Sequence, residues 1–220
     1  RNAWQGEVWS NRRDNTDYLE WLSISTIRND AGKIVRYVGV FSDITDRWKQ
    51  EQVIRHMALH DGLTGLPNRA LLMERLGHLI TMAQRAPRPM ALMFLDLDGF
   101  KAVNDTLGHQ VGDQVLNTVS VRLKELLRAS DTVARLGGDE FVILLDNPEN
   151  QAGVTLIATR VIEAVNCPID LPNQKAHVGV TVGIALYPAH GTSSDALLKS
   201  ADDAMYAAKA LGKNRFCFAG

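Results

Sequence analysis

The stretch Met90-Ala91-Leu92-Met93-Phe94-Leu95 is apolar at every position and leads directly into Asp96-Leu97-Asp98-Gly99. An apolar run without alternation is typical of a strand that is buried on both faces of a sheet. A carboxylate at the end of such a strand loses solvation unless it pairs with a cation or a donor. The stretch therefore predicts a central strand that ends in acidic groups, although two turn or helix-capping aspartates would give the same pattern.

Segments with helical and strand periodicity alternate along the chain on both sides of this strand. A helix is expected to begin at Pro67-Asn68-Arg69 and to end before residues 85–89. Further helices are predicted over 113–128, 152–165 and 195–211, and further strands over 133–136, 140–145, 178–185 and 216–218. Interleaved strands and helices predict one α/β (α+β) domain built on a central sheet.

The first sixty residues have a different pattern. Short apolar segments at 6–9, 18–28 and 34–41 are separated by polar turn sequences, which predicts a three-stranded antiparallel meander. So small a sheet cannot bury enough apolar surface alone and needs a cover. A helix is expected between Asp43 and His60. It is either a connector that packs on a neighbouring sheet or a dimer-forming signalling helix, and its short, broken heptads leave both readings open.

Composition excludes several classes of function. The 220 residues are 45% hydrophobic and 22% charged, with a net charge of -1, which is a soluble globular balance. No basic block is interleaved with aromatic residues, so we expect no nucleic-acid polymer as a partner. The longest apolar run, Met90 to Leu95, is too short to cross a bilayer. We expect a cytoplasmic domain, with any membrane attachment of the parent protein supplied by segments upstream of Arg1.

Two more carboxylates, Asp139 and Glu140, follow Gly137-Gly138 at a turn between two apolar segments. The glycines permit a tight hairpin and let a ligand approach the backbone closely. Acidic side chains would repel one another here unless a divalent cation or a substrate hydroxyl lay between them. If the two strand ends are neighbours, hard oxygen ligands beside phosphate favour Mg²⁺ in a two-metal phosphoryl-transfer site. Gly212-Lys213 lacks the context of a P-loop, so phosphate must be held in another way.

Motifs in four regions occur in order and together resemble the GGDEF family of diguanylate cyclases. They are Asp61-Gly62-Leu63-Thr64-Gly65-Leu66-Pro67-Asn68-Arg69, Phe94 to Lys101, Asn104-Asp105 with Gly108-His109, and Arg135-Leu136-Gly137-Gly138-Asp139-Glu140-Phe141. The resemblance covers residues 60–220. It implies a palm-like nucleotidyl cyclase fold whose central sheet is mostly antiparallel, and the condensation of two GTP molecules into cyclic di-GMP plus pyrophosphate.

The resemblance also implies the roles of individual acidic residues. Asp96 and Asp139 would bind Mg²⁺, for which Mn²⁺ can substitute, and the Leu97 carbonyl would complete the shell. Glu140 would lie at the attacking 3′-hydroxyl, as a metal contact or a proton acceptor. The catalytic residues are thus expected to be Asp139 and Glu140.

The substrate-binding residues implied by the resemblance are Asn104, His109, Asp113, Gly137, Gly138, Lys209 and Lys213. Asn104 and Asp113 would read the guanine edge, and a carboxylate can accept from guanine N1–H and the exocyclic amine together, which favours GTP over ATP. His109 would help to bind the nucleotide or serve as a structural hydrogen bonder. Lys209 and Lys213 would contact the triphosphate, or form a solvated helix end that the helix dipole favours.

Three further expectations concern partners and regulation. One GTP per domain implies a homodimer with two-fold symmetry. Arg128-Ala129-Ser130-Asp131 stands where the family carries an inhibitory RxxD site, so Arg128 and Asp131 would bind the product, although a helix-end arginine and a capping aspartate give the same pattern. The alternative function is a silent module that binds GTP or cyclic di-GMP, and a phosphodiesterase domain could follow Gly220.

Residues 1–43 resemble the C-terminal third of a PAS sensory domain. Glu7-Val8-Trp9, the hairpin with Asp14 and especially Arg36 to Thr45 carry this resemblance, which covers less than half of such a domain. The predicted organisation is therefore a PAS fragment over 1–43, a linker signalling helix over 44–59 and a GGDEF diguanylate cyclase domain over 60–220.

Overall fold

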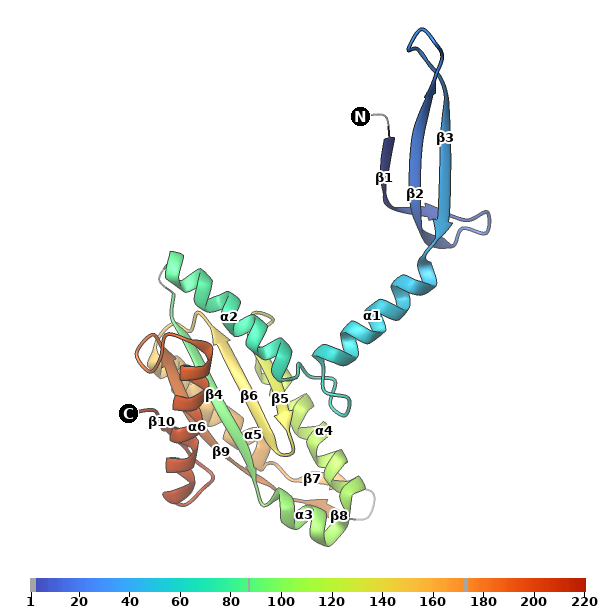
Figure 1. Ribbon diagram of the computed structural model, residues 1–220. Coiled ribbons are helices and arrows are strands. Elements are labelled where there is room, and N and C mark those ends of the chain that lie inside the picture. Colours follow the sequence, from blue (N-terminus) through green and yellow to red (C-terminus); the bar gives the residue numbers. More distant parts are fainter. Residues whose placement is uncertain (1–2, 87, 172–173) are drawn as a thin grey trace. The chain divides into compact units, whose positions relative to one another are not determined.

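The structure is a computed structural model that describes residues 3–86, 88–171 and 174–220. The chain divides into two compact units, residues 1–58 and 59–220 (Figure 1). Among the described residues, none of the helices combines the length and the apolar character that a membrane span requires.

The first unit is an antiparallel meander followed by a helix. Its sheet has the order β1 (Ala3–Asn11), β2 (Asp17–Arg28) and β3 (Ile34–Asp43), and α1 (Thr45–Leu59) follows. Thr45 ties the start of α1 to the middle strand, because its Oγ1 accepts from the Leu19 N–H at 2.9 Å. The rings of Trp9 and Trp48 meet edge to face at 5.4 Å. The predicted meander is confirmed, and its strands are longer than the sequence indicated.

A five-stranded sheet forms the centre of the second unit, in the order β10-β9-β4-β6-β5 (Figure 1). β4 (Met90–Asp98) lies between antiparallel neighbours, and β10 alone runs parallel to its neighbour β9. Residues 90 to 95 are at most 7% exposed, as their apolar run predicts. The other strands are β5 (Thr132–Gly137), β6 (Glu140–Asp146), β9 (Gly179–Tyr187) and β10 (Phe216–Phe218).

Helices cover both faces of this sheet, and the side chains of β4 alternate between two cores. Ala91, Met93 and Leu95 pack with α4 (His109–Leu126) and α5 (Gln151–Asn166). Met90, Leu92 and Phe94 pack with α2 (Arg69–Arg85) and α6 (Ser194–Ala210). The mostly antiparallel sheet flanked by helices is therefore the fold that the sequence predicts.

Three short elements escaped the sequence prediction. α3 (Phe100–Leu107) begins after Gly99, whose φ is +83°, and ends at Gly108, whose φ is +85°. Its eight residues are fewer than the window over which helical periodicity is read from a sequence, and it is anchored by the buried side chains of Phe100 and Val103. β7 (Ile169–Leu171) and β8 (Gln174–Ala176) form a separate two-stranded antiparallel sheet. In addition, α4 begins at residue 109 rather than 113.

Gly183 allows α6 to lie directly on β9. A Cβ atom at this position would lie 1.9 Å from the Ala201 carbonyl oxygen and 2.2 Å from the Met205 nitrogen. Both are backbone atoms in the middle of α6, so the helix could not avoid the added carbon without moving as a whole. The close approach matters for the site described below, because α6 carries Lys209.

We therefore expect Gly183→Ala to destabilise the protein by at least about 1–3 kcal/mol, the usual range for overpacking. Gly77→Ala is the control, because nothing lies within 4 Å of a Cβ at that position of α2. Alanine there should stabilise by roughly 0.5–1 kcal/mol through the loss of glycine's conformational freedom. Urea denaturation of both variants measures the difference, and equal stabilities would contradict the packing described.

Candidate active site

The acidic residues of the two motifs meet at one end of the sheet. Asp96 on β4 and Glu140 on β6 are paired across the two strands. The Leu97 N–H donates to the Asp139 carbonyl at 3.2 Å, so the turn between β5 and β6 is fastened to the end of β4. Carboxylates far apart in the sequence thus lie side by side, which is the convergence that the sequence predicts.

Burial and mutual repulsion perturb these carboxylates. Partial burial raises the pKa of Asp96, and the hydrogen bond and charge of Lys209 oppose that rise, while Asp139 and Asp98 add to it. Burial likewise raises the pKa of Glu140, and the charges of Asp96, Asp202 and Asp139 raise it further against Lys209. The negative charge of these carboxylates therefore exceeds the positive charge that Lys209 supplies to them.

Lys209 supplies the cation nearest to this cluster. Its Nζ lies 2.8 Å from Asp96 Oδ1, and the two side chains are 29% and 17% exposed. A carboxylate pair that is short of positive charge suits a cation. Among the residues with described positions, however, no group of three or more His, Cys, Asp or Glu side chains is arranged to hold a metal ion. A metal that bound Asp96 would therefore have to exchange with the ammonium of Lys209.

Asp98, the second aspartate at the end of β4, holds the segment that follows α6. Its Oδ2 accepts from Thr181 Oγ1 at 2.7 Å and from the Asn214 N–H at 3.0 Å. Lys213 and Asn214 have φ values of +59° and +47°, in the left-handed region that residues with a side chain rarely adopt. The hydrogen bonds to Asp98 offset this strain and fix the backbone from which Lys213 projects. Beyond the presence of an acidic residue at position 98, no local pattern indicated this role.

Arg135 holds the glycine turn from the other side. Its Nε and Nη2 donate to the Gly138 carbonyl at 3.1 and 2.8 Å. Its Nη1 donates to both Asp61 carboxylate oxygens, at 2.9 and 3.0 Å, and the two side chains are 10% and 20% exposed. Although burial opposes ionisation, hydrogen bonds from Thr64 and Arg135 lower the pKa of Asp61. Sequence reasoning placed Asp61 and Arg135 in motifs but did not pair them.

The predicted guanine-binding residues lie at the corner between α3 and α4. Asn104 is half-buried on α3, whereas His109 and Asp113 are exposed on the first turns of α4. α3 begins two residues after Asp98, so Gly99 alone joins the end of β4 to this helix. The chain then passes along α3 to the corner at Gly108, from which α4 begins.

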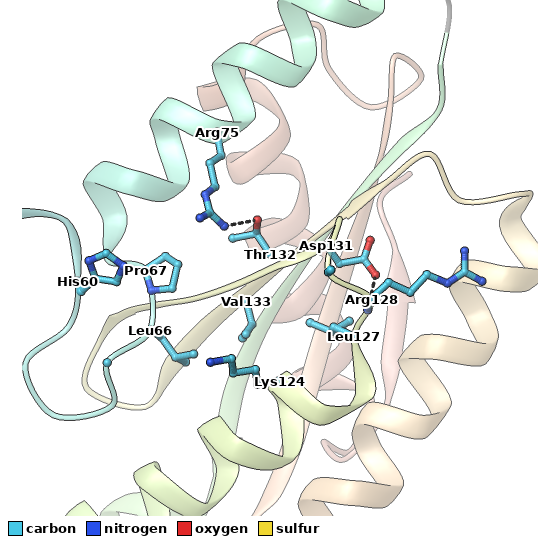
Figure 2. A pocket seen from close by; sticks show the side chains of 12 residues that line it. His60, Leu66, Pro67, Arg75, Lys124, Leu127, Arg128, Asp131, Thr132 and Val133 are labelled. Carbon is cyan, nitrogen blue, oxygen red and sulfur yellow. Dashed lines mark hydrogen bonds between the residues drawn. The ribbon is translucent and has the colours of Figure 1, made fainter. Parts of the chain in front are cut away.

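The RxxD residues lie at the other end of α4, beside a cavity of about 530 Å³. Asp131 accepts from the backbone N–H groups of Arg128 and Asp146, each at 3.2 Å. In Figure 2 the Arg75 guanidinium points at Thr132, to which it donates at 2.9 Å, and Arg128 extends away from Arg75. Arg128 and Asp131 also border a second hollow of about 200 Å³. The pair is therefore accessible from two sides.

The family described as "Diguanylate cyclase, GGDEF domain" matches residues 58–215 of the chain. The chain belongs to the GGDEF family. Residues 59–220 are therefore called the GGDEF unit below.

Two curated relatives come from Pseudomonas aeruginosa. The chain is 46% identical over 162 residues to the bifunctional diguanylate cyclase/cyclic di-GMP phosphodiesterase MucR, covering 74% of the chain and 24% of MucR. It is 45% identical over 157 residues to the diguanylate cyclase TpbB, covering 71% of the chain and 36% of TpbB. The chain thus spans between a quarter and about a third of the length of these relatives.

Solved structures resemble the GGDEF unit closely. The GGDEF domain of TpbB has a TM-score of 0.71 at 42% identity, covering 73% of this chain and 94% of that one. The GGDEF domain of DgcB from Caulobacter crescentus, solved in complex with c-di-GMP, has a TM-score of 0.68 at 30% identity, covering 74% and 96%.

The charge imbalance in the GGDEF unit generates a prediction about stability. Because the folded-state pKa of Glu140 is raised, its ionisation lowers stability at pH values above that pKa. This destabilisation decreases as the pH falls through the folded-state pKa. It is absent below the ordinary carboxyl pKa, where Glu140 is protonated in both the folded and the unfolded protein. Glu140→Gln should therefore stabilise the ligand-free protein near neutral pH, by no more than about 1 kcal/mol because solvent screens this partly exposed carboxylate.

Urea denaturation over a series of pH values measures this gain, which should shrink on acidification. Glu163→Gln, an exposed acid on α5, is the matched control and should give no such gain. A Glu140→Gln protein that is no more stable than wild type near neutral pH would contradict the electrostatic account.

Proposed function

We propose that the chain is a diguanylate cyclase, which joins two GTP molecules into cyclic di-GMP and releases pyrophosphate. The observation that carries the proposal is the cross-strand pairing of Asp96 with Glu140 beside Asp139, within a GGDEF domain. Two similar proteins support the proposal. TpbB is named a diguanylate cyclase, and the GGDEF domain of DgcB was solved in complex with c-di-GMP.

The reaction needs positioning and charge neutralisation more than covalent help from the protein. The 3′-oxygen of each GTP attacks the α-phosphorus of the other, so that two P–O bonds form, two bonds to pyrophosphate break and two pyrophosphates leave. The hydroxyl proton passes to Glu140 or to solvent. A raised pKa suits Glu140 to this task, because a general base works best when its pKa approaches the working pH.

Phosphate and base are recognised at different places in this proposal. Lys209 and Lys213 bind the triphosphate, and the Asp98 network holds the backbone at Lys213. The backbone at Gly137 and Gly138 lies against the nucleotide. Asn104 and Asp113 read the guanine edge, and His109 adds a further contact. Asp113 favours guanine because a carboxylate can accept from two adjacent N–H donors that adenine lacks.

The carboxylates fit a divalent cation, because they are partly buried, mutually repelling and oxygen-rich. Asp96, Asp139, Glu140 and the Leu97 carbonyl would hold Mg²⁺, or Mn²⁺ in its place, after the Lys209 ammonium leaves Asp96 and the acidic side chains, which are not arranged around an ion in the described residues, turn toward it. Bound there, the ion would neutralise charge on the phosphates and lower the pKa of the 3′-hydroxyl. The repulsion among the acids in the ligand-free state favours its uptake.

Each domain offers one nucleotide site, so the proposed active species is a homodimer in which two such sites face each other. We propose further that residues 1–43 are the last part of a PAS domain and that residues 44–59 transmit its signal. The proposed setting is cytoplasmic, with membrane attachment only through other parts of the parent protein. The alternative function is a module that binds GTP or cyclic di-GMP without turnover.

Incubation with GTP and Mg²⁺, followed by mass identification of the product, tests the activity. Wild type should form cyclic di-GMP, and Glu140→Gln should lose about 100-fold or more in rate if the carboxylate accepts the proton. Glu163→Gln is the control for a lost surface charge and should retain the wild-type rate. GTP binding without product from wild type would favour the binding module instead.

Product inhibition is tested at Arg128. We propose that Arg128 and Asp131 bind cyclic di-GMP from the hollows described above (Figure 2). Loss of a charged hydrogen-bond donor should raise the cyclic di-GMP concentration for half-inhibition about 10- to 100-fold in Arg128→Ala. Lys199→Ala, which removes an exposed cation from α6, should leave inhibition as in wild type. Unchanged inhibition of Arg128→Ala would place the inhibitory site elsewhere.

A further inference from the structure

Gly112 of α4 faces the side chain of Asn104 across the corner between α3 and α4. A Cβ atom at Gly112 would lie 1.9 Å from Asn104 Oδ1 and 3.0 Å from its Cγ. The ring of Phe100 is the third neighbour, with Cζ at 3.3 Å. The Asn104 amide therefore occupies the space that any other residue at 112 would fill.

Backbone conformation does not explain a glycine at this position. Gly112 lies inside α4, and its N–H donates to the Gly108 carbonyl at 3.2 Å in the helical pattern. Its φ is not in the left-handed region, in contrast to Gly99 and Gly108. A glycine inside a helix is less favourable than alanine, because it loses more conformational freedom on folding. What the glycine provides is space for a side chain, and that side chain is an amide.

We propose that Gly112 is a positioning residue for base recognition, which sets the orientation of Asn104 beside Asp113. The inference rests on the proposed function, in which Asn104 and Asp113 read the guanine edge. Asp113 follows Gly112 directly in the chain, so one helical turn supplies a carboxylate and the space for an amide. A half-buried amide packed against backbone keeps fewer orientations than an exposed one and binds at a lower entropic cost.

Gly112 and Gly183 differ in the kind of atom that an added Cβ would meet. At Gly183 the nearest atoms belong to the backbone of α6, so a methyl group there displaces a helix. At Gly112 the nearest atoms belong to a side chain that can rotate about its own bonds. Alanine at 112 should therefore displace the Asn104 amide and leave the fold intact, with a gain in helix propensity.

The experiment measures equilibrium binding of α,β-methylene GTP and α,β-methylene ATP, which share a triphosphate that cannot be transferred. Gly112→Ala should weaken binding of the guanine analogue roughly 3- to 10-fold, the loss expected for one hydrogen bond. Its affinity for the adenine analogue should change by less than about twofold, because the triphosphate contacts are untouched. Gly77→Ala, a helical glycine with open space around its Cβ, is the matched control and should bind both analogues as wild type does.

Asn104→Ala removes the atoms that the new methyl group would meet. It should weaken binding of the guanine analogue as Gly112→Ala does, and adding Gly112→Ala to it should cause no further loss. The midpoint of thermal unfolding should be no lower for Gly112→Ala than for wild type, which excludes a general folding defect.

Four outcomes would overturn the inference. They are unchanged binding in Gly112→Ala, equal losses for both analogues, a lower unfolding midpoint, and a further loss in the double variant. If wild type itself fails to bind the guanine analogue, the proposed function falls and this inference falls with it. Wild-type binding without an effect of Gly112→Ala leaves the proposed function standing and removes only the role of Gly112.

Discussion

The site depends on one constraint, the pairing of β4 with β6 that sets Asp96 opposite Glu140. Seven residue pairs with β6 and nine with β9 hold β4 in this register, and a shift by one residue would turn every side chain of β4 toward the wrong core. The sheet thus holds like charges together that would separate in a flexible chain. Lys209 offsets part of the repulsion through its contact with Asp96. What remains is a site that attracts cations.

Three features of the structure hold the main chain around the paired carboxylates in place. Gly183 lets α6 lie close enough to β9 for Lys209 to reach Asp96. Arg135 holds the carbonyl of Gly138 and anchors it to Asp61. Asp98 holds the strained segment after α6. Each of these three features fixes a position of the main chain rather than of a side chain. A site that is preorganised before its ligand binds requires such fixed positions.

The long periodic elements could be predicted from the sequence, because their burial pattern is local. The apolar run at residues 90 to 95 predicted a strand that is buried on both faces. The amphipathic helices were predicted with ends that differ by only a few residues from those in the structure. α3 was missed because its eight residues between two glycines are fewer than the window over which helical periodicity is read. The pairing of Arg135 with Asp61 was missed as well. The two lie in different motifs, and an ion pair between distant residues leaves no spacing to detect.

By itself the sequence determined which long elements form, that acids follow the central strand and the glycine turn, and that the chain resembles the GGDEF family. Those properties depend on patterns among residues that are neighbours in the sequence. Tertiary structure alone decided that Asp98 braces Asn214, that Lys209 contacts Asp96 and that the Asn104 amide fills the space beside Gly112. These contacts join segments whose separation in space is set by the packing of helices on the sheet, and no local pattern encodes that distance.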